Sequence, residues 1–275
     1  MDNSIELSNF QISNHQPLCI IGGVNVLESE DLAMRVAEKF KATTEQLNMP
    51  WVFKGSFDKA NRSSLDSYRG PGIDKGLEIL TKVKDSFDVP LITDIHEPSQ
   101  ATAVAEVCEI IQIPAFLCRQ TDLVTAAAKT NQIIQFKKPQ FLAAHEMKNV
   151  INKSIAAGNN KNILCERGNS FGYNNLVVDM LNFQVMKELD VPVIFDVTHS
   201  LQLPGGLGFA AGGRRDLMLP LAKSGVAQKI AGIFLETHPN PDEAKCDGPC
   251  ATPLDQLPKV LEELKALDDL IKSQS

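Results

Sequence analysis

Eight short apolar runs, several of them rich in β-branched residues, recur along the 275 residues of this chain. They span residues 18–21, 51–53, 91–93, 110–113, 133–136, 163–164, 193–195 and 232–235. Most are separated by segments with helical periodicity, such as 31–48, where Leu32, Val36 and Phe40 share one stripe. Strand–helix alternation repeated eight times within about 250 residues predicts an α/β chain folded as a closed parallel (β/α)8 barrel, the TIM barrel.

The alternative architecture is an open, doubly wound sheet, but no GxGxxG follows the first run. We expect residues 1–275 to form a single barrel domain. The polar stretch 4–13 carries Ile5, Leu7, Phe10 and Ile12. It predicts an N-terminal hairpin, within residues 1–15, that covers the bottom of the barrel. The glycine-rich stretch 204–213 lies in the seventh strand–helix connection and is expected to be a mobile active-site loop.

Charge and composition exclude several classes of protein. Thirty-four acidic and 27 basic residues give a net charge of -7, which disfavours nucleic acid and anionic membranes as partners. No apolar run reaches the length of a membrane span, and the N-terminus lacks the basic and apolar segments of a secretory signal, so we expect a cytoplasmic protein. The CxxxC spacing of Cys246 and Cys250 is a weak zinc signal, and three other cysteines lie in or beside apolar runs, as buried hydrophobes do.

The residues that follow each strand are the informative feature, because catalytic groups of such barrels lie at the carboxyl ends of the strands. Nearly every strand is followed there by an ionisable group. In strand order from the second, these residues are Lys54, Lys59, Asn61, Arg62 and Ser63; Asp94, His96 and Glu97; Gln112, Pro114 and Ala115; Lys137 and Lys138; Glu166 and Arg167; Asp196, His199 and Ser200; and Glu236 and His238.

Six cations are expected to converge on one mouth, and their mutual repulsion favours a ligand with several negative charges. They are Lys54, Lys59, Arg62, Lys137, Lys138 and Arg167. Two phosphates and a carboxylate would balance them, since arginine binds oxyanions in a bidentate fashion and lysine acts as a point charge. Two alternatives stay open: the cations are ordinary surface ion-pair partners, or one lysine forms an imine as in a Schiff-base aldolase.

A second constellation consists of His199, Glu236 and Asp247, from the last two strands and the loop that follows them. Histidine and carboxylate ligands suit a divalent cation. The residue available from the first strand as a fourth ligand is Asn25, whose neutral amide oxygen binds weakly where a thiolate would bind strongly.

Several motifs resemble those of the 3-deoxy-D-manno-octulosonate 8-phosphate synthases, over almost the whole chain. They occupy residues 22–29, 53–64, 67–72, 93–98, 112–117, 137–141, 196–200 and 245–249. The resemblance implies a (β/α)8 barrel, usually a homotetramer, that needs no cofactor and condenses phosphoenolpyruvate with D-arabinose 5-phosphate, releasing inorganic phosphate on a route to lipopolysaccharide or a plant wall polysaccharide.

The resemblance also implies roles for individual residues. Phosphoenolpyruvate would be held by Lys59, Lys137 and Arg167, beside Lys54, Gln112 and Ala115, the last preceded by Pro114 of the same motif. The aldose would meet Asn61, Arg62, Ser63 and Ser200, and its phosphate would also meet Arg119 of a neighbouring subunit. Asp94 belongs to the same substrate site, while Asn25, Lys59, Lys137, His199 and Asp247 are the candidate catalytic residues.

The same resemblance separates close alternatives. Seven-carbon synthases, which use erythrose 4-phosphate, have Lys-Pro-Arg-Thr-Ser where this chain has the sequence from Lys59 to Ser64 with an additional Asn61. Metal-dependent members have cysteine where Asn25 stands, so the resemblance implies a metal-independent enzyme in which His199, Glu236 and Asp247 position water and substrate. A non-catalytic barrel that binds phosphosugars is the remaining alternative.

Overall fold

The structure is a computed structural model that describes residues 4–205 and 212–274. Eight parallel strands form a closed barrel, because β11 and β14, the first and last of these eight strands in the sheet, also pair with each other. The barrel strands are β3 (Cys19–Val26), β4 (Trp51–Ser56), β5 (Leu91–Asp94), β6 (Ile110–Ile113), β7 (Ile133–Lys137), β8 (Asn162–Glu166), β11 (Val193–Asp196) and β14 (Gly232–His238). A short strand, β15 (Thr252–Pro253), pairs beyond β14. The predicted (β/α)8 barrel is confirmed.

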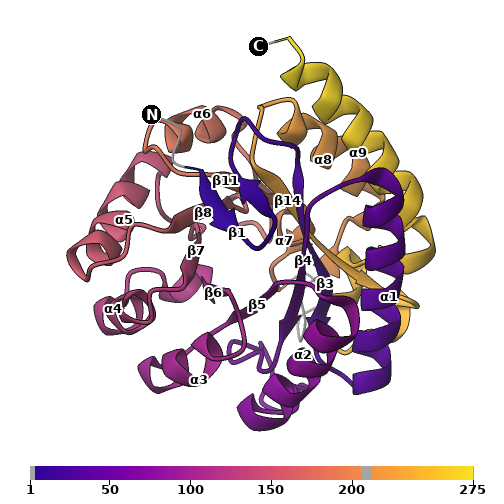
Figure 1. The fold of residues 1–275 in the computed structure, drawn as a ribbon, viewed down its shortest axis with the longest axis horizontal. Coiled ribbons are helices and arrows are strands. Elements are labelled where there is room, and N and C mark those ends of the chain that lie inside the picture. Colours follow the sequence, from indigo (N-terminus) through magenta and orange to yellow (C-terminus); the bar gives the residue numbers. More distant parts are fainter. Residues whose placement is uncertain (1–3, 206–211, 275) are drawn as a thin grey trace.

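Helices surround the barrel as an outer ring (Figure 1). They are α1 (Glu30–Leu47), α2 (Ile73–Phe87), α3 (Ala101–Ala105), α4 (Thr121–Lys129), α5 (Met147–Ala156), α6 (Leu181–Lys187), α8 (Met218–Val226) and α9 (Leu257–Lys272), with a single turn, α7 (Val197–Ser200), directly after β11. The first helix begins where its sequence suggests, because the Ser29 side chain accepts a hydrogen bond from the Leu32 backbone N–H. It ends at Asn48, which adopts the left-handed conformation with φ 51°.

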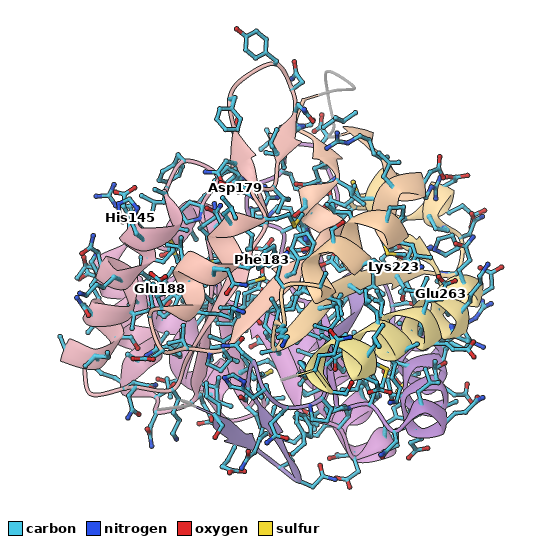
Figure 2. All side chains as sticks on the ribbon, turned by 90° about the horizontal axis from the view of Figure 1, so that it is seen from above. His145, Asp179, Phe183, Glu188, Lys223 and Glu263 are labelled. Carbon is cyan, nitrogen blue, oxygen red and sulfur yellow. The ribbon has the colours of Figure 1, made fainter. Side chains whose placement is uncertain are left out.

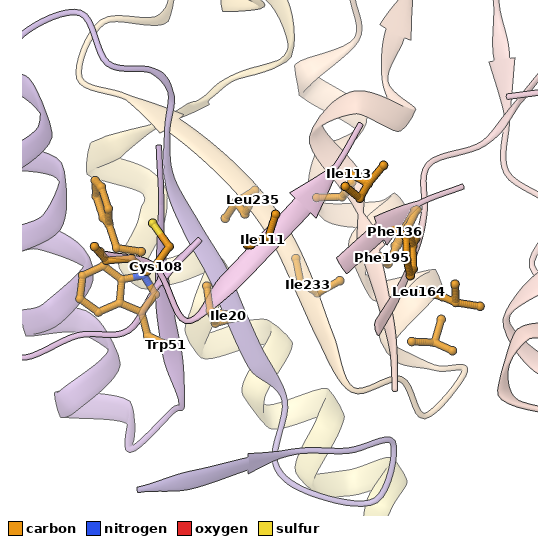
Figure 3. Packing of buried hydrophobic residues seen from close by; sticks show 14 of the residues in the cluster. Ile20, Trp51, Cys108, Ile111, Ile113, Phe136, Leu164, Phe195, Ile233 and Leu235 are labelled. Carbon is orange, nitrogen blue, oxygen red and sulfur yellow. The ribbon is translucent and has the colours of Figure 1, made fainter. Parts of the chain in front are cut away.

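Strand residues alternate between two environments, as the two-residue period of a β-strand requires. One set faces the helices and forms the larger apolar core, in which Ile20, Trp51, Ile111, Phe136 and Leu164 are buried (Figure 3). The alternate residues face the inside of the barrel. This parity decides which polar residues at the strand ends reach the barrel mouth and which face the helix layer.

Ion pairs and aromatic contacts tie the helix ring together on the outside of the barrel. Lys223 of α8 and Glu263 of α9 form an ion pair, and their side chains lie near each other in Figure 2. Phe183 of α6 is buried and packs edge-on against Phe195 of β11, with ring centroids 5.1 Å apart. The helices are therefore held to the barrel by apolar burial, with charged contacts at the surface.

The N-terminal hairpin covers one end of the barrel. Strands β1 (Ile5–Leu7) and β2 (Phe10–Ile12) pair antiparallel and lie across the barrel in Figure 1. Ile5, Leu7 and Ile12 are buried in a second apolar cluster with interior residues of the barrel strands, among them Ile163 of β8. The predicted hairpin is present, with its strands inside residues 5–12.

Two further short strand pairs lie in loops at the carboxyl end of the barrel. One is β9 (Asn169–Ser170) with β10 (Leu176–Val177), and the other is β12 (Gln202–Leu203) with β13 (Gly212–Gly213). The glycine-rich loop predicted at 204–213 falls largely on residues 206–211, which lie outside the described part of the chain. Among the described residues, no helix has both the length and the apolar character needed to span a membrane.

Candidate active site

A cavity of about 830 Å³ opens at the carboxyl end of the barrel. Twelve of the predicted catalytic and substrate-binding residues line it: Lys59, Asn61, Arg62, Ser63, Asp94, Gln112, Pro114, Ala115, Lys137, Arg167, His199 and Asp247. Its volume lies in the range of small-molecule sites, and residues far apart in the sequence meet there because parallel strands end at one face.

The other predicted site residues lie around this cavity without lining it. Lys54, Asn25 and Glu236 are buried beside it. The Ser200 hydroxyl donates to the Asp196 carbonyl at 2.7 Å, within the turn of α7. Arg119 is exposed on the outer side, just beyond β6, where its backbone carbonyl accepts a hydrogen bond from Lys153.

A buried chain of polar groups crosses the floor of the cavity from β4 to β5. The Lys54 ammonium donates to the Ser56 hydroxyl at 2.5 Å, and Ser56 donates to Asp94. Asp94 also lies 3.1 Å from the His96 ring, which lines the cavity. Burial lowers the pKa of Lys54 to about 8, although Asp94 opposes the shift. The pKa of Asp94 falls well below its usual range because Lys54 and His96 outweigh the effect of burial.

Lys137, Asp196 and His199 form a second buried array at the ends of β7 and β11. The Lys137 ammonium donates to Asp196 Oδ2 at 2.5 Å, and the same carboxylate lies 2.7 Å from His199 Nδ1. His199 and Lys137 hold the pKa of Asp196 far below its usual range against the effect of burial. The Lys137 ammonium also lies 3.8 Å from the centre of the Phe234 ring, which limits where it can move.

The other ring nitrogen of His199 faces two carboxylates. Its Nε2 lies 3.4 Å from Glu236 and 3.8 Å from Asp247. Neither oxygen of Glu236 has a hydrogen-bond partner within the described structure, although the residue is fully buried. A buried carboxylate without donors is unstable unless something else supplies them, so these oxygens face a position suited to water or a substrate hydroxyl.

The fit to a metal ion is incomplete at these residues. Asn25 donates its amide N–H to Asp247 at 2.9 Å, and its buried amide oxygen, a weaker metal ligand than a thiolate, has no hydrogen-bond partner in the described chain. Within residues 4–205 and 212–274, no group of three or more His, Cys, Asp or Glu side chains is arranged to hold a metal ion, although His199 lies near both Glu236 and Asp247. The contacts around Asp247 are hydrogen bonds, and burial is outweighed by His199 and Lys59, which lower the pKa of Asp247 to about 2.

Lys59 and Arg62 add positive charge to the lining of the cavity. Burial would lower the pKa of Lys59, but Glu236 and Asp94 outweigh it and raise the pKa above its usual value. The Arg62 guanidinium contacts Cys246 and the Lys245 carbonyl, in the loop after β14. The sulfur and the arginine therefore join two loops at the rim of the cavity. Burial raises the pKa of the Cys246 thiol.

Lys138 does not join the other cations at the mouth, contrary to the sequence-based expectation. Strand parity turns it away from Lys137, and its ammonium is fully buried among the Asn169 side chain and the carbonyls of Pro139, Leu142 and Gly168. It also lies 3.3 Å from Glu166. The Glu166 carboxylate accepts hydrogen bonds from the backbone N–H groups of Arg167 and Gly168. This pair shapes the turn that carries Arg167.

Two polar residues of the site escaped the sequence-based prediction. Ser56 lies two positions after Lys54, so the strand period would have placed both on the inside of the barrel. Gln202 begins β12 and lines the cavity, where it bridges Arg167 and Asp247. No feature of the local sequence distinguishes Gln202 from an ordinary loop glutamine.

The closed barrel and its cation-lined cavity define an enzyme-type site for small anionic molecules. The chain belongs to the DAHP synthetase I family, which matches residues 3–273. It is 61% identical over 269 residues to the 2-dehydro-3-deoxyphosphooctonate aldolase of Pseudomonas fluorescens (strain Pf0-1), covering 98% of this chain and 96% of that protein. The protein of the same name from Pseudomonas savastanoi pv. phaseolicola is 60% identical over 270 residues, with the same coverage.

Proposed function

We propose that the chain condenses phosphoenolpyruvate with D-arabinose 5-phosphate and water, giving 3-deoxy-D-manno-octulosonate 8-phosphate and inorganic phosphate for lipopolysaccharide precursors. The observation that carries this proposal is the identity of 60–61% with 2-dehydro-3-deoxyphosphooctonate aldolases over 98% of the chain. The cavity suits this chemistry because its cations can balance two phosphates and a carboxylate.

The phosphoenolpyruvate site lies between Lys59, Lys137 and Arg167 in this proposal. All three line the cavity, and Nη1 of the buried Arg167 has no hydrogen-bond partner in the described chain, as expected of a group reserved for an oxyanion. Gln112 and Ala115 line the adjacent wall. Lys54, buried beside the cavity, contributes its positive charge to this site without lining it.

The aldose site lies on the rim formed by Asn61, Arg62 and Ser63, which follow β4. The Asn61 amide is available for the hydroxyl groups of the longer sugar, and Arg62 for its phosphate. Ser200 completes the proposed aldose site; its hydroxyl donates to the Asp196 carbonyl and keeps its oxygen as an acceptor.

The reaction proceeds by attack of carbon 3 of phosphoenolpyruvate on the aldehyde carbon, which forms the new carbon–carbon bond and an alkoxide that takes up a proton. Water adds to carbon 2 and loses a proton, and the resulting phosphohemiketal expels inorganic phosphate to leave the ketone. The cation cluster stabilises the alkoxide and the phosphates. His199, Glu236 and Asp247 position the water, because the unpartnered Glu236 oxygens and the His199 ring face one position.

We further propose that the reaction needs neither metal nor another cofactor. The support is Asn25, whose amide donates to Asp247 where a thiolate would serve as a soft ligand. The hydrogen bonds from Asn25 and Gln202 to Asp247 then hold the carboxylate in place without an ion. Activity that survives exhaustive EDTA treatment is the expected result, and loss that a divalent metal restores would contradict it.

Assembly and location follow the same proposal. We infer a homo-oligomer, a tetramer by resemblance, in which exposed Arg119 enters the aldose phosphate site of a neighbouring subunit. The adjacent Phe116 is 53% exposed, which is unusual for a phenylalanine and suits a subunit contact. Each chain is then one barrel domain with its hairpin. The six cysteines are buried free thiols, which suits a reducing cytoplasm.

The decisive experiment measures phosphate release from phosphoenolpyruvate with a panel of phosphorylated aldoses. Arabinose 5-phosphate should give a far higher kcat/KM than erythrose 4-phosphate. An equal or reversed preference would assign a seven-carbon product. Borohydride added with substrate should trap no covalent adduct, whereas inactivation with a modified lysine would indicate imine chemistry. If no aldose supported phosphate release, the remaining alternative would be a non-catalytic barrel that binds phosphosugars.

A further inference from the structure

Gln202 connects the anion-binding side of the cavity to its acidic side. Its Oε1 accepts a hydrogen bond from Arg167 Nη2 at 2.7 Å, and its Nε2 donates to Asp247 Oδ1 at 2.9 Å. The chemistry of the partners fixes the orientation of the amide, because guanidinium only donates and an ionised carboxylate only accepts. The reverse orientation would place NH2 against the guanidinium and C=O against the carboxylate.

The backbone of Gln202 is held in register by its neighbours. It pairs with Gly213 across the β12–β13 ladder, and Gly213 packs so tightly against Cys250 that a Cβ there would lie 2.4 Å from the sulfur. The amide is therefore presented from a fixed strand rather than from a free loop end.

A neutral amide at this place separates two charges that attract each other. Arg167 and Asp247 both line the cavity; burial lowers the pKa of Arg167, and Asp196 and then Asp247 oppose that shift. Arginine and carboxylate groups that meet directly form bidentate pairs, which would use the nitrogens needed for a substrate oxyanion. With Gln202 between them, Nη1 of Arg167 keeps no partner in the described chain, and Asp247 Oδ2 stays with Asn25.

We propose that Gln202 is a positioning residue of this active site: it holds Arg167 apart from Asp247, so that the guanidinium remains open to the phosphate of phosphoenolpyruvate. The inference rests on the proposed function, since it takes phosphoenolpyruvate as the ligand of Arg167. In this proposal a neutral side chain keeps Arg167, which binds the phosphate, apart from Asp247, which helps to position the water. Gln202 itself need not touch the reacting atoms.

The test compares Gln202→Leu, Gln202→Glu and the matched control Gln184→Leu on α6, whose exposed amide donates to Gln228, away from the cavity. Gln202→Leu keeps most of the volume and removes both hydrogen bonds. We expect the KM for phosphoenolpyruvate, and its Kd by calorimetry, to rise about tenfold, the scale of one hydrogen bond to a charged group, with a smaller change in kcat. Gln202→Glu keeps the acceptor toward Arg167 but sets a carboxylate against Asp247, so kcat should fall more than KM changes.

A double-mutant cycle separates positioning from a general loss of structure. In an Arg167→Lys background, Gln202→Leu should weaken phosphoenolpyruvate binding by much less than it does in the wild type, because the partner it positions is gone. Additive effects, or unchanged KM and Kd in Gln202→Leu, would overturn the inference. Thermal unfolding of each variant identifies misfolding. Wild-type protein that binds phosphoenolpyruvate but turns over no aldose would instead count against the proposed function.

Discussion

The two ends of the barrel interior differ in polarity: one is filled by apolar side chains and the other by polar and ionisable ones. At the end closed by the hairpin, the strands contribute Val52, Ile92, Ile110 and Ile133 to a buried apolar cluster. At the other end, two or more residues further along the same strands, the interior holds Lys54, Asp94, Gln112 and Lys137. The backbone is the same at both ends, and only the side chains change from apolar to ionisable.

This difference indicates which end stabilises the fold and which end works on substrate. Apolar burial at the closed end lowers the free energy of the folded state roughly in proportion to area. Buried charges at the open end cost desolvation free energy, which their ion pairs only partly offset. The charges there are useful because a low-dielectric site strengthens their interaction with an anionic transition state. Variants at matched positions can test this division.

The largest effect on stability is expected at Lys138, which lies near the open end but faces the helices. Lys138→Met removes the partner of the fully buried Glu166 and should lower the free energy of unfolding by about 3–5 kcal/mol. Denaturant unfolding measures this. Adding Glu166→Gln removes the stranded charge and should recover part of the loss. Equal stability of the single variant and the wild type would mean that the pair is replaceable by packing alone.

A cavity at the closed end should weaken the fold without changing the chemistry. Ile163 is fully buried in the interior cluster beneath the hairpin, and Ile163→Ala should lower the free energy of unfolding by roughly 3 kcal/mol. At a temperature where the variant is folded, kcat and KM should match the wild type. A large change in kcat at full folding would show that the two ends are not separable.

At Arg167 we expect the opposite result, a loss of activity without a loss of stability. Arg167→Met keeps much of the stem volume and removes a buried cation, so kcat/KM should fall at least about 10²-fold, equivalent to about 2.7 kcal/mol. Stability should not fall, because burial already disfavours the charged guanidinium and lowers its pKa. Chemical denaturation beside steady-state kinetics tests both halves. A parallel loss of stability and activity would assign Arg167 a structural role.

The smallest effect concerns pH and Lys54, whose pKa burial lowers to about 8 from 10.5. Between these values the unfolded chain binds more protons than the folded one, so this group makes stability rise as pH rises through that window. The same loss of charge should make kcat/KM fall with an apparent pKa of about 8. Lys54→Arg should shift this alkaline limb upward. If the alkaline fall of kcat/KM stayed at the same pH in Lys54→Arg, the titrating group would be a residue other than Lys54.

The sequence predicted the barrel and most of the cavity, because both depend on local patterns. Eight apolar runs and the polar residues behind them determine strand number and place Lys59, Lys137 and Arg167 at one face. The expectation for Lys138 was wrong because it assumed that Lys138, the sequence neighbour of Lys137, reaches the same cavity. Successive residues of a strand point to opposite faces. Gln202 was missed because its role depends on two partners, 35 and 45 residues away, that no local pattern relates to it.

The opposite orientations of Lys137 and Lys138 also limit how the gene can change. A one-residue insertion or deletion within β7 would exchange the two lysines, turning the ion partner of Glu166 into the barrel and the ligand-facing ammonium into the helix layer. Length changes in the loops that follow the strands leave that parity intact. We therefore expect natural length variation among relatives to accumulate in those connections, while the eight strands keep their number of residues and so the alternation of inward and outward side chains.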